Sequence, residues 1–91
     1  MGPETQKLSE SLTNIEEILN QQKEQHWANM IGQANSEIQN QDFGGVERFL
    51  SLFGGMGSLN DLVLTDSGQA GKLDSLLSIA HKLATSIKRQ Q

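Results

Sequence analysis

The stretch LDSLLSIAHKLATSI, residues 73–87, decides the fold class of this chain. Its apolar residues recur at intervals of three and four positions, which places them on one broad face of a helix. These residues are Leu73, Leu76, Leu77, Ala80, Leu83, Ala84 and Ile87. The turn-forming residues TDSG precede it at 65–68, and the basic residues Lys88 and Arg89 after it complement a helix dipole. The sequence therefore predicts a helix from about Gln69 to Lys88.

Two more amphipathic helices are predicted upstream. Apolar residues at intervals of four, three and four occur at Leu8, Leu12, Ile15 and Leu19, and again at Trp27, Ile31, Ala34 and Ile38. Residues 20–25 between the two stripes contain no apolar side chain, no Gly and no Pro. This segment is either a turn or the bend of one long helix. Gly32 lies inside the second stripe and indicates the close approach of a neighbouring helix, because glycine otherwise destabilises a helix by ~1 kcal/mol relative to alanine.

A short third helix is predicted after the second stripe. Asp42 is its candidate N-cap. Its apolar residues are Val46, Phe49, Leu50 and Phe53, and Gly54-Gly55 end it. Beyond the glycines, Ser58 and Asp61 have the spacing of a capping box, which predicts one apolar helical turn that includes Leu59, Leu62 and Val63.

These elements predict an all-α fold, because no alternating strand pattern and no internal repeat occurs. The expected architecture is a small bundle of three to four helices with a glycine-rich loop before a short helical turn. Ninety-one residues suffice for one domain, residues 1–91, with residues 1–5 and 89–91 frayed. We expect Trp27, Ile31, Phe49, Phe53 and Leu77 to share its core.

Composition excludes several classes of function. The chain has no cysteine, which excludes disulfides and thiolate metal sites. No apolar run approaches the ~18 residues of a membrane span, and no signal peptide is apparent, so we expect a cytoplasmic protein without membrane contact. The net charge is −4, with −7 up to Asp66 and +3 from Ser67 onward. An acidic body of this kind argues against nucleic-acid binding.

The residues that could carry catalysis are not arranged for it. His26 and His81 are far apart and have no metal-ligand spacing to a second ligand. No serine lies in a nucleophile elbow. Glu16 and Glu17 are neighbours on a solvated helix face, and Asp66 has a capping position. We therefore expect no catalytic residue, no metal and no cofactor, and interpret the chain as a binding protein rather than an enzyme.

The glycine-rich segment is the candidate binding site. Three glycines in the four residues 54–57 free the backbone for close approach, and they lead into a predicted helix N-terminus, where N–H groups can hold an anion. The P-loop ending Gly-Lys-Ser/Thr is absent. The alternative is a tight interhelical connection in which the glycines only allow packing. The candidate ligand- or partner-binding residues are Gly55, Met56, Gly57, Ser58, Asn60, Asp61, Trp27 and Arg48.

The same residues carry a resemblance. Trp27, DFGG at 42–45 and GGMGSLNDLVL at 54–64 resemble a family of small uncharacterised bacterial proteins. Those proteins have a tryptophan-bearing helix and a Gly-Gly-Met-Gly-Ser-x-Asn-Asp-Leu-Val-Leu box. The resemblance extends over roughly residues 8–85. It implies no activity, although a glycine-rich box as the family hallmark implies that the loop does more than pack.

Two classes of function follow as hypotheses. The first is a small inhibitor or immunity or counter-defence module that binds a protein partner stoichiometrically, since an acidic surface can steer onto a basic active site. The alternative is a protein that binds or sequesters a small nucleotide or other phosphate-bearing signal, with Arg48, Lys72 or a second subunit supplying positive charge. A structural oligomerisation module is a third reading. The small core beside an apolar box also predicts a homodimer.

Overall fold

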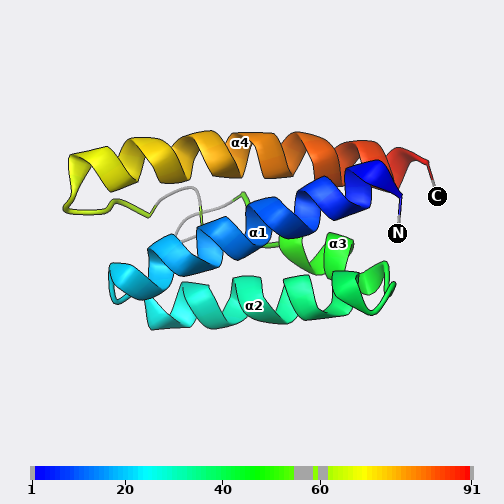
Figure 1. Cartoon of the computed structure of the whole chain (residues 1–91), viewed down its shortest axis with the longest axis horizontal. Helices are drawn as coiled ribbons and strands as arrows, with labels where there is room; N and C mark the ends of the chain where they lie inside the picture. The colour runs from blue at the N-terminus through cyan, green and yellow to red at the C-terminus, as the bar shows by residue number, and fades with distance from the viewer. Residues whose placement is uncertain (1, 55–58, 60–61, 91) are drawn as a thin grey trace.

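The computed structural model describes residues 2–54, 59 and 62–90, and it contains four helices (Figure 1). They are α1 (Pro3–Gln21), α2 (Gln25–Gln39), α3 (Gly44–Leu50) and α4 (Ser67–Arg89). No strand occurs in these described parts of the chain. The predicted fold, an all-α small bundle, is confirmed.

The glutamine-rich segment after the first helix is a turn rather than a bend. α1 ends at Gln21 and α2 begins at Gln25. Lys23 adopts a φ of 62°, in the left-handed region, and the N–H of Glu24 donates to the carbonyl of Leu19 at 2.8 Å. The chain therefore reverses direction here, and α2 runs back along α1 (Figure 1).

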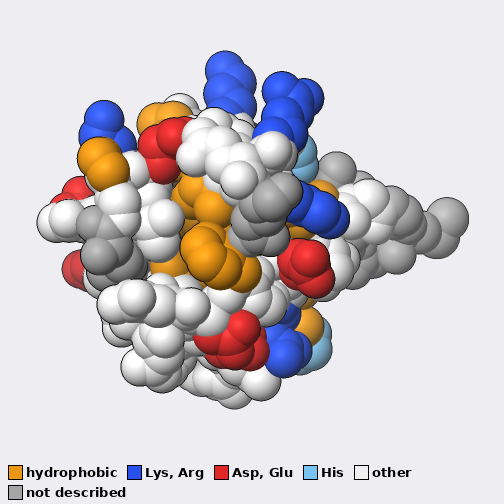
Figure 2. Space-filling model, turned by 90° about the vertical axis from the view of Figure 1, so that its right-hand side faces the viewer, with side chains coloured by type: hydrophobic (Ala, Val, Ile, Leu, Met, Phe, Trp, Pro, Cys, Tyr) orange, Lys and Arg blue, Asp and Glu red, His pale blue; other side chains and the backbone are white. Residues whose placement is uncertain are grey.

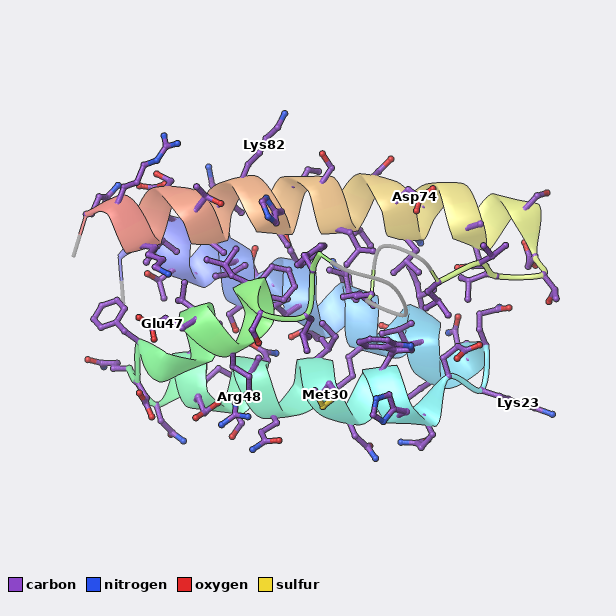
Figure 3. The ribbon with its side chains drawn as sticks, turned by 180° about the vertical axis from the view of Figure 1, so that it is seen from behind. Lys23, Met30, Glu47, Arg48, Asp74 and Lys82 are labelled. Carbon is purple, nitrogen blue, oxygen red and sulfur yellow. The ribbon has the colours of Figure 1, made fainter. Side chains whose placement is uncertain are left out.

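α1 and α3 lie on opposite sides of the pair formed by α2 and α4. α1 packs along both α2 and α4, and α3 also contacts both of them. Figure 1 shows α1 in front, whereas Figure 3, drawn from behind, shows α3 in front. The core lies between these layers. Its fully buried large side chains are Phe49, Leu8, Leu12, Ile15, Leu19, Ile31, Ile38, Leu59, Leu73 and Val46.

The expected common core is confirmed for some of its members. Ile31, Phe49 and Leu77 are buried, whereas Trp27 and Phe53 are half-buried and pack against the core from outside. The two aromatic side chains thus combine a packing role with an exposed edge.

At Gly32, α2 meets the end of the Glu16 side chain of α1 rather than the closely approaching helix that the sequence indicates. A Cβ added at Gly32 would lie 2.8 Å from a carboxylate oxygen of Glu16. Glu16 is therefore folded over α2 and half-buried, rather than lying on a fully solvated face. Glycine at position 32 leaves room for this side chain.

The third helix is shorter than predicted. α3 ends at Leu50, so Phe53 lies beyond the helix, and Gly54 follows it with a φ of 87°. Asp42 is not the N-cap, because Phe43 occupies that position; the Asp42 carboxylate instead accepts from the N–H of Gly44 at 2.9 Å. The apolar spacing could not show where α3 ends, since a turn after a helix can continue the same pattern of burial.

The start of α4 agrees with its capping signal. Asp66 is the N-cap, and its carboxylate accepts from the N–H of Gln69 at 3.0 Å. The helix thereby begins at Ser67, two residues before the predicted start at Gln69. Asp66 satisfies one of the backbone donors that every helix N-terminus leaves unpaired.

The apolar turn predicted at 59–63 is only partly correct. Leu59 is fully buried, and the N–H of Leu62 donates to its carbonyl at 3.2 Å. Val63, however, is 84% exposed, while Leu64 is buried. Residues 62–64 are not helical. Burial changes from residue to residue here because the chain crosses the core surface in an irregular conformation.

Candidate functional site

The described residues between α3 and α4 pack on the core between α2 and α4, on the side away from α1 (Figure 3). Leu52, Leu59 and Leu64 anchor it, since all three belong to the buried core. The N–H of Leu59 donates to the carbonyl of Leu52 at 2.8 Å, which joins the two ends of the glycine-rich stretch. The apolar residues on both sides of the glycines therefore help to complete the core.

Several apolar side chains remain partly accessible on this side. Trp27 and Met30 of α2 precede Ala34 by seven and four positions, and Ala34 contacts Gly45 of α3, so helical periodicity places them on the same side. We define the α3 face by the half-buried Trp27, Met30, Leu50, Phe53 and Leu62 together with the exposed Val63. The half-buried side chains of this face pack against the core, whereas the Val63 side chain is exposed to solvent.

A hollow of about 340 Å³ lies at the edge of the α3 face, between Phe53 and α4. The Phe53 ring contacts the Phe49 ring edge-on at 5.1 Å between centroids, and the His81 ring at 4.9 Å. The other lining residues are Asp74, Leu77, Ser78 and Lys82. Figure 3 shows that the Lys82 side chain points away from the bundle. The hollow thus offers ring edges and a carboxylate, with the ammonium group directed elsewhere.

Charged groups of both signs border the α3 face, since the exposed Lys82 lines the hollow together with Asp74. Arg48 on α3 donates through Nε to the Glu37 carboxylate on α2 at 2.5 Å. Within the described part of the chain, Arg48 and Glu37 form the one ion pair. Glu47 and Asp74 are exposed and have no cationic partner among the described residues. Figure 3 shows Glu47, Arg48 and Asp74 on the side that carries α3. Two acidic groups and one ammonium group, that of Lys82, therefore border the apolar face.

The sequence-predicted site residues are only partly placed. Gly55, Met56, Gly57, Ser58, Asn60 and Asp61 lie outside the described residues. Trp27 and Arg48 are not brought together: Arg48 is tied to Glu37, which is ten residues and therefore about 15 Å beyond Trp27 along α2. Trp27 instead contacts the ring of His26 at 5.2 Å between centroids.

Sequence reasoning missed the hollow beside Phe53. Asp74, Ser78 and His81 recur at helical spacing on one side of α4, so their common side was readable. No local signal indicated that Phe53 packs against His81, because that contact depends on how the segment after α3 crosses the bundle.

Comparison with known proteins identifies the family. Residues 20–72 match the family described as a domain of unknown function (DUF6966). The chain belongs to this family. The DUF6966 range includes α2, α3 and the start of α4, and thus every residue that defines the α3 face. No curated protein and no solved structure matches the chain.

The described residues form neither a membrane-spanning helix nor a metal-binding cluster. No helix among them has the length and apolar character needed to cross a membrane. In the same part of the chain, no group of three or more His, Asp or Glu side chains is placed to hold a metal ion.

Proposed function

We propose that this DUF6966 protein is a non-enzymatic module that binds a protein partner stoichiometrically in the cytoplasm, through the α3 face. An inhibitor or immunity or counter-defence role fits such a module. The observation that carries the proposal is the position of Val63. It is 84% exposed between Leu62 and Leu64, which pack on or in the core. An apolar side chain held outward by two anchored neighbours contributes little to folding and is available for contact.

The half-buried residues of the α3 face are of the type that dominates protein interfaces. Aromatic residues and Met are enriched in interface centres, and the α3 face presents Trp27, Met30 and Phe53 partly exposed. Because these side chains are fixed by packing against the core, they lose little conformational freedom on binding. A rigid, partly apolar face of this kind favours a protein partner over a small polar ligand.

The charge on this side indicates the chemistry of the partner. Glu47 and Asp74 outnumber Lys82 among the unpaired charges of the described residues that border the face, and the whole chain carries −4. A partner surface with Lys or Arg side chains around an apolar centre would be complementary. Such complementarity raises the association rate and makes it sensitive to salt.

Affinity purification from the native cells tests the proposal with two matched variants. Val63→Glu places a charge in the α3 face, whereas Ile79→Glu places one at another exposed apolar position, on α4. Ile79 follows Leu76 by one turn, and Leu76 lines a hollow with α1 residues, so it lies on the other side of α4. We expect the wild type and Ile79→Glu to retain one basic protein at constant stoichiometry, and Val63→Glu to lose it.

Circular dichroism melts of all three proteins provide the folding control, since exposed substitutions should change stability by no more than ~0.5 kcal/mol. Equal retention of the partner by Val63→Glu and the wild type would overturn the proposal. Retention of an acidic protein that persists at high salt would overturn the proposal as well.

A small nucleotide-like ligand is the second candidate, supported by the hollow beside Phe53 and His81, whose rings could contact a base. The charge needed for a phosphate is its weak point, since Arg48 is paired with Glu37 and Lys72 lines a different hollow, facing α1. A thermal-shift series against nucleotides tests it. A ligand at 100 times its Kd would stabilise the fold by ~2.7 kcal/mol, a rise in Tm of more than about 10 °C for a domain of this size.

A further inference from the structure

Phe43 is an exposed aromatic side chain at the end of the bundle, outside the α3 face. It is 52% exposed and occupies the N-cap position of α3. Ser, Thr, Asp or Asn is preferred at an N-cap, because a side-chain oxygen can accept from the first backbone donors. Here Asp42, one position earlier, accepts from the N–H of Gly44. Phe43 makes no capping bond, so local helix chemistry does not account for it.

The backbone around Phe43 is firmly held. Gln41 has a φ of 61°, and the N–H of Asp42 donates to the carbonyl of Glu37 at 2.9 Å. On the other side, Gly45 packs so closely on α2 that an added Cβ would lie 2.6 Å from the carbonyl oxygen of Ala34. The direction of the Phe43 side chain is thus set by the turn between α2 and α3. This rigidity makes the ring suitable as a binding anchor.

Phe43 stands between two hollows. The first, of about 320 Å³, lies between the start of α1 and the turn before α3; it is lined by Gly2, Thr5, Ile38, Gln41, Asp42, Phe43 and Val46. The second, of about 360 Å³, lies between the start of α1 and the end of α4. Its lining residues are Gly2, Pro3, Glu4, Thr5, Phe43, Ile87 and Gln90. A projecting ring next to recesses on one surface is the arrangement that a two-fold axis can make self-complementary.

The border of this surface carries both signs of charge. Figure 2 looks onto this end of the bundle and shows apolar side chains in the middle, with acidic and basic side chains around them. Glu4 lies in the first turn of α1, and Lys88 and Arg89 lie in the last turn of α4. Gln90 donates a hydrogen bond to Glu4 at 2.8 Å, which joins these two helix ends. A border that carries both signs of charge can pair with the same border of a second copy.

We propose that a second copy of this chain binds at this end, so that Phe43 of each protomer enters the hollow between α1 and the α2–α3 turn of its partner. The bundle measures 24 × 20 Å across its long axis, about 480 Å². Stable interfaces bury about 800 Å² on each partner. The dimer is therefore weak and forms at high protein concentration. It uses a different surface from the proposed partner-binding face.

Sedimentation equilibrium over a hundredfold concentration range tests the proposal with Phe43→Asp and Ile79→Asp. Both substitutions add one negative charge at a half-exposed apolar position, 52% and 51% exposed in the wild type. We expect the mass of the wild type and of Ile79→Asp to rise toward that of a dimer with concentration, and Phe43→Asp to remain a monomer. A wild type that is monomeric throughout, or a Phe43→Asp protein that dimerises as the wild type does, overturns the proposal.

Isotope-filtered NMR on a mixture of labelled and unlabelled wild-type chains shows which surfaces meet. Contacts between the Phe43 ring of one chain and the methyl groups of Ile38 or Val46 of the other are expected. Intermolecular contacts at Val63 instead would contradict the proposed geometry. Because Val63→Glu leaves the Phe43 end unchanged, it should still dimerise, so failure of the dimer and failure of partner binding are distinguishable.

Discussion

Ser9 of α1 donates a hydrogen bond to the side-chain oxygen of Asn35 of α2, at 2.7 Å, and both residues are only 6% exposed. The Asn35 amide nitrogen donates in turn to the Thr13 hydroxyl at 3.0 Å, and Gln39 donates to the Ser9 hydroxyl at 3.2 Å. Buried polar groups need such partners, since an unsatisfied one is costly. This network sets how α1 lies along α2, because a slip of either helix would leave several groups unpaired.

Asn35→Ala should therefore destabilise the fold beyond the loss of one contact. The buried Ser9 hydroxyl loses its acceptor, and the expected cost is ~1–3 kcal/mol. Chemical denaturation measures it. Asn29→Ala is the control, because Asn29 is exposed and bonds only to Gln25 in its own helix. Equal stability of the two variants would show that the network contributes nothing.

Two glycine substitutions should have opposite effects. Gly45→Ala brings a Cβ within 2.6 Å of the Ala34 carbonyl oxygen, so α3 must move off α2, and we expect a loss of ~1–3 kcal/mol. Gly71→Ala in α4 meets no atom within 4 Å and should stabilise the fold by ~0.5–1 kcal/mol, because alanine favours the helix. Thermal melts measure the stability of the two variants. A Gly45→Ala protein as stable as Gly71→Ala would contradict the close packing of α3 on α2.

Phe49 and Trp27 should differ in their contribution to stability. Phe49 is fully buried, and its replacement by Ala should cost ~3–5 kcal/mol. Trp27 is half-buried, so Trp27→Ala should cost clearly less. Urea unfolding gives both values. A larger loss for Trp27 would mean that its ring is the true centre of the core and is not available to a partner.

Glu4 should make a small, pH-dependent contribution to stability. Hydrogen bonds from Gln90 and Ser86 lower the pKa of the Glu4 carboxyl from its usual 4.5. A lowered pKa in the folded state means that the contribution is present above about pH 4.5 and is lost as pH falls through the folded-state pKa. NMR titration should find the pKa of Glu4 below its usual value in the wild type and closer to it in Gln90→Ala. An unchanged titration curve in that variant would exclude Gln90 as the main cause.

Periodicity by itself located the apolar stripes of the three longer helices, although it left open whether the first two form one long bent helix. The stripes in residues 8–19, 27–38 and 73–87 each predict one helix, and the structure contains all three, because spacing of three and four residues is a local property of the chain. Asp66 as the cap of α4 was readable because capping is also a local property of the chain.

Only the tertiary structure decided how these helices meet and what is left on the surface. Phe53 lies against His81, Val63 points outward and Phe43 stands between two hollows because of the path that the chain takes between α2 and α4. The apolar pattern makes no such distinction: Leu59, Val63 and Phe43 are all apolar, yet only Leu59 is buried. Burial depends on neighbours distant in sequence, and the surfaces available for binding follow from those contacts.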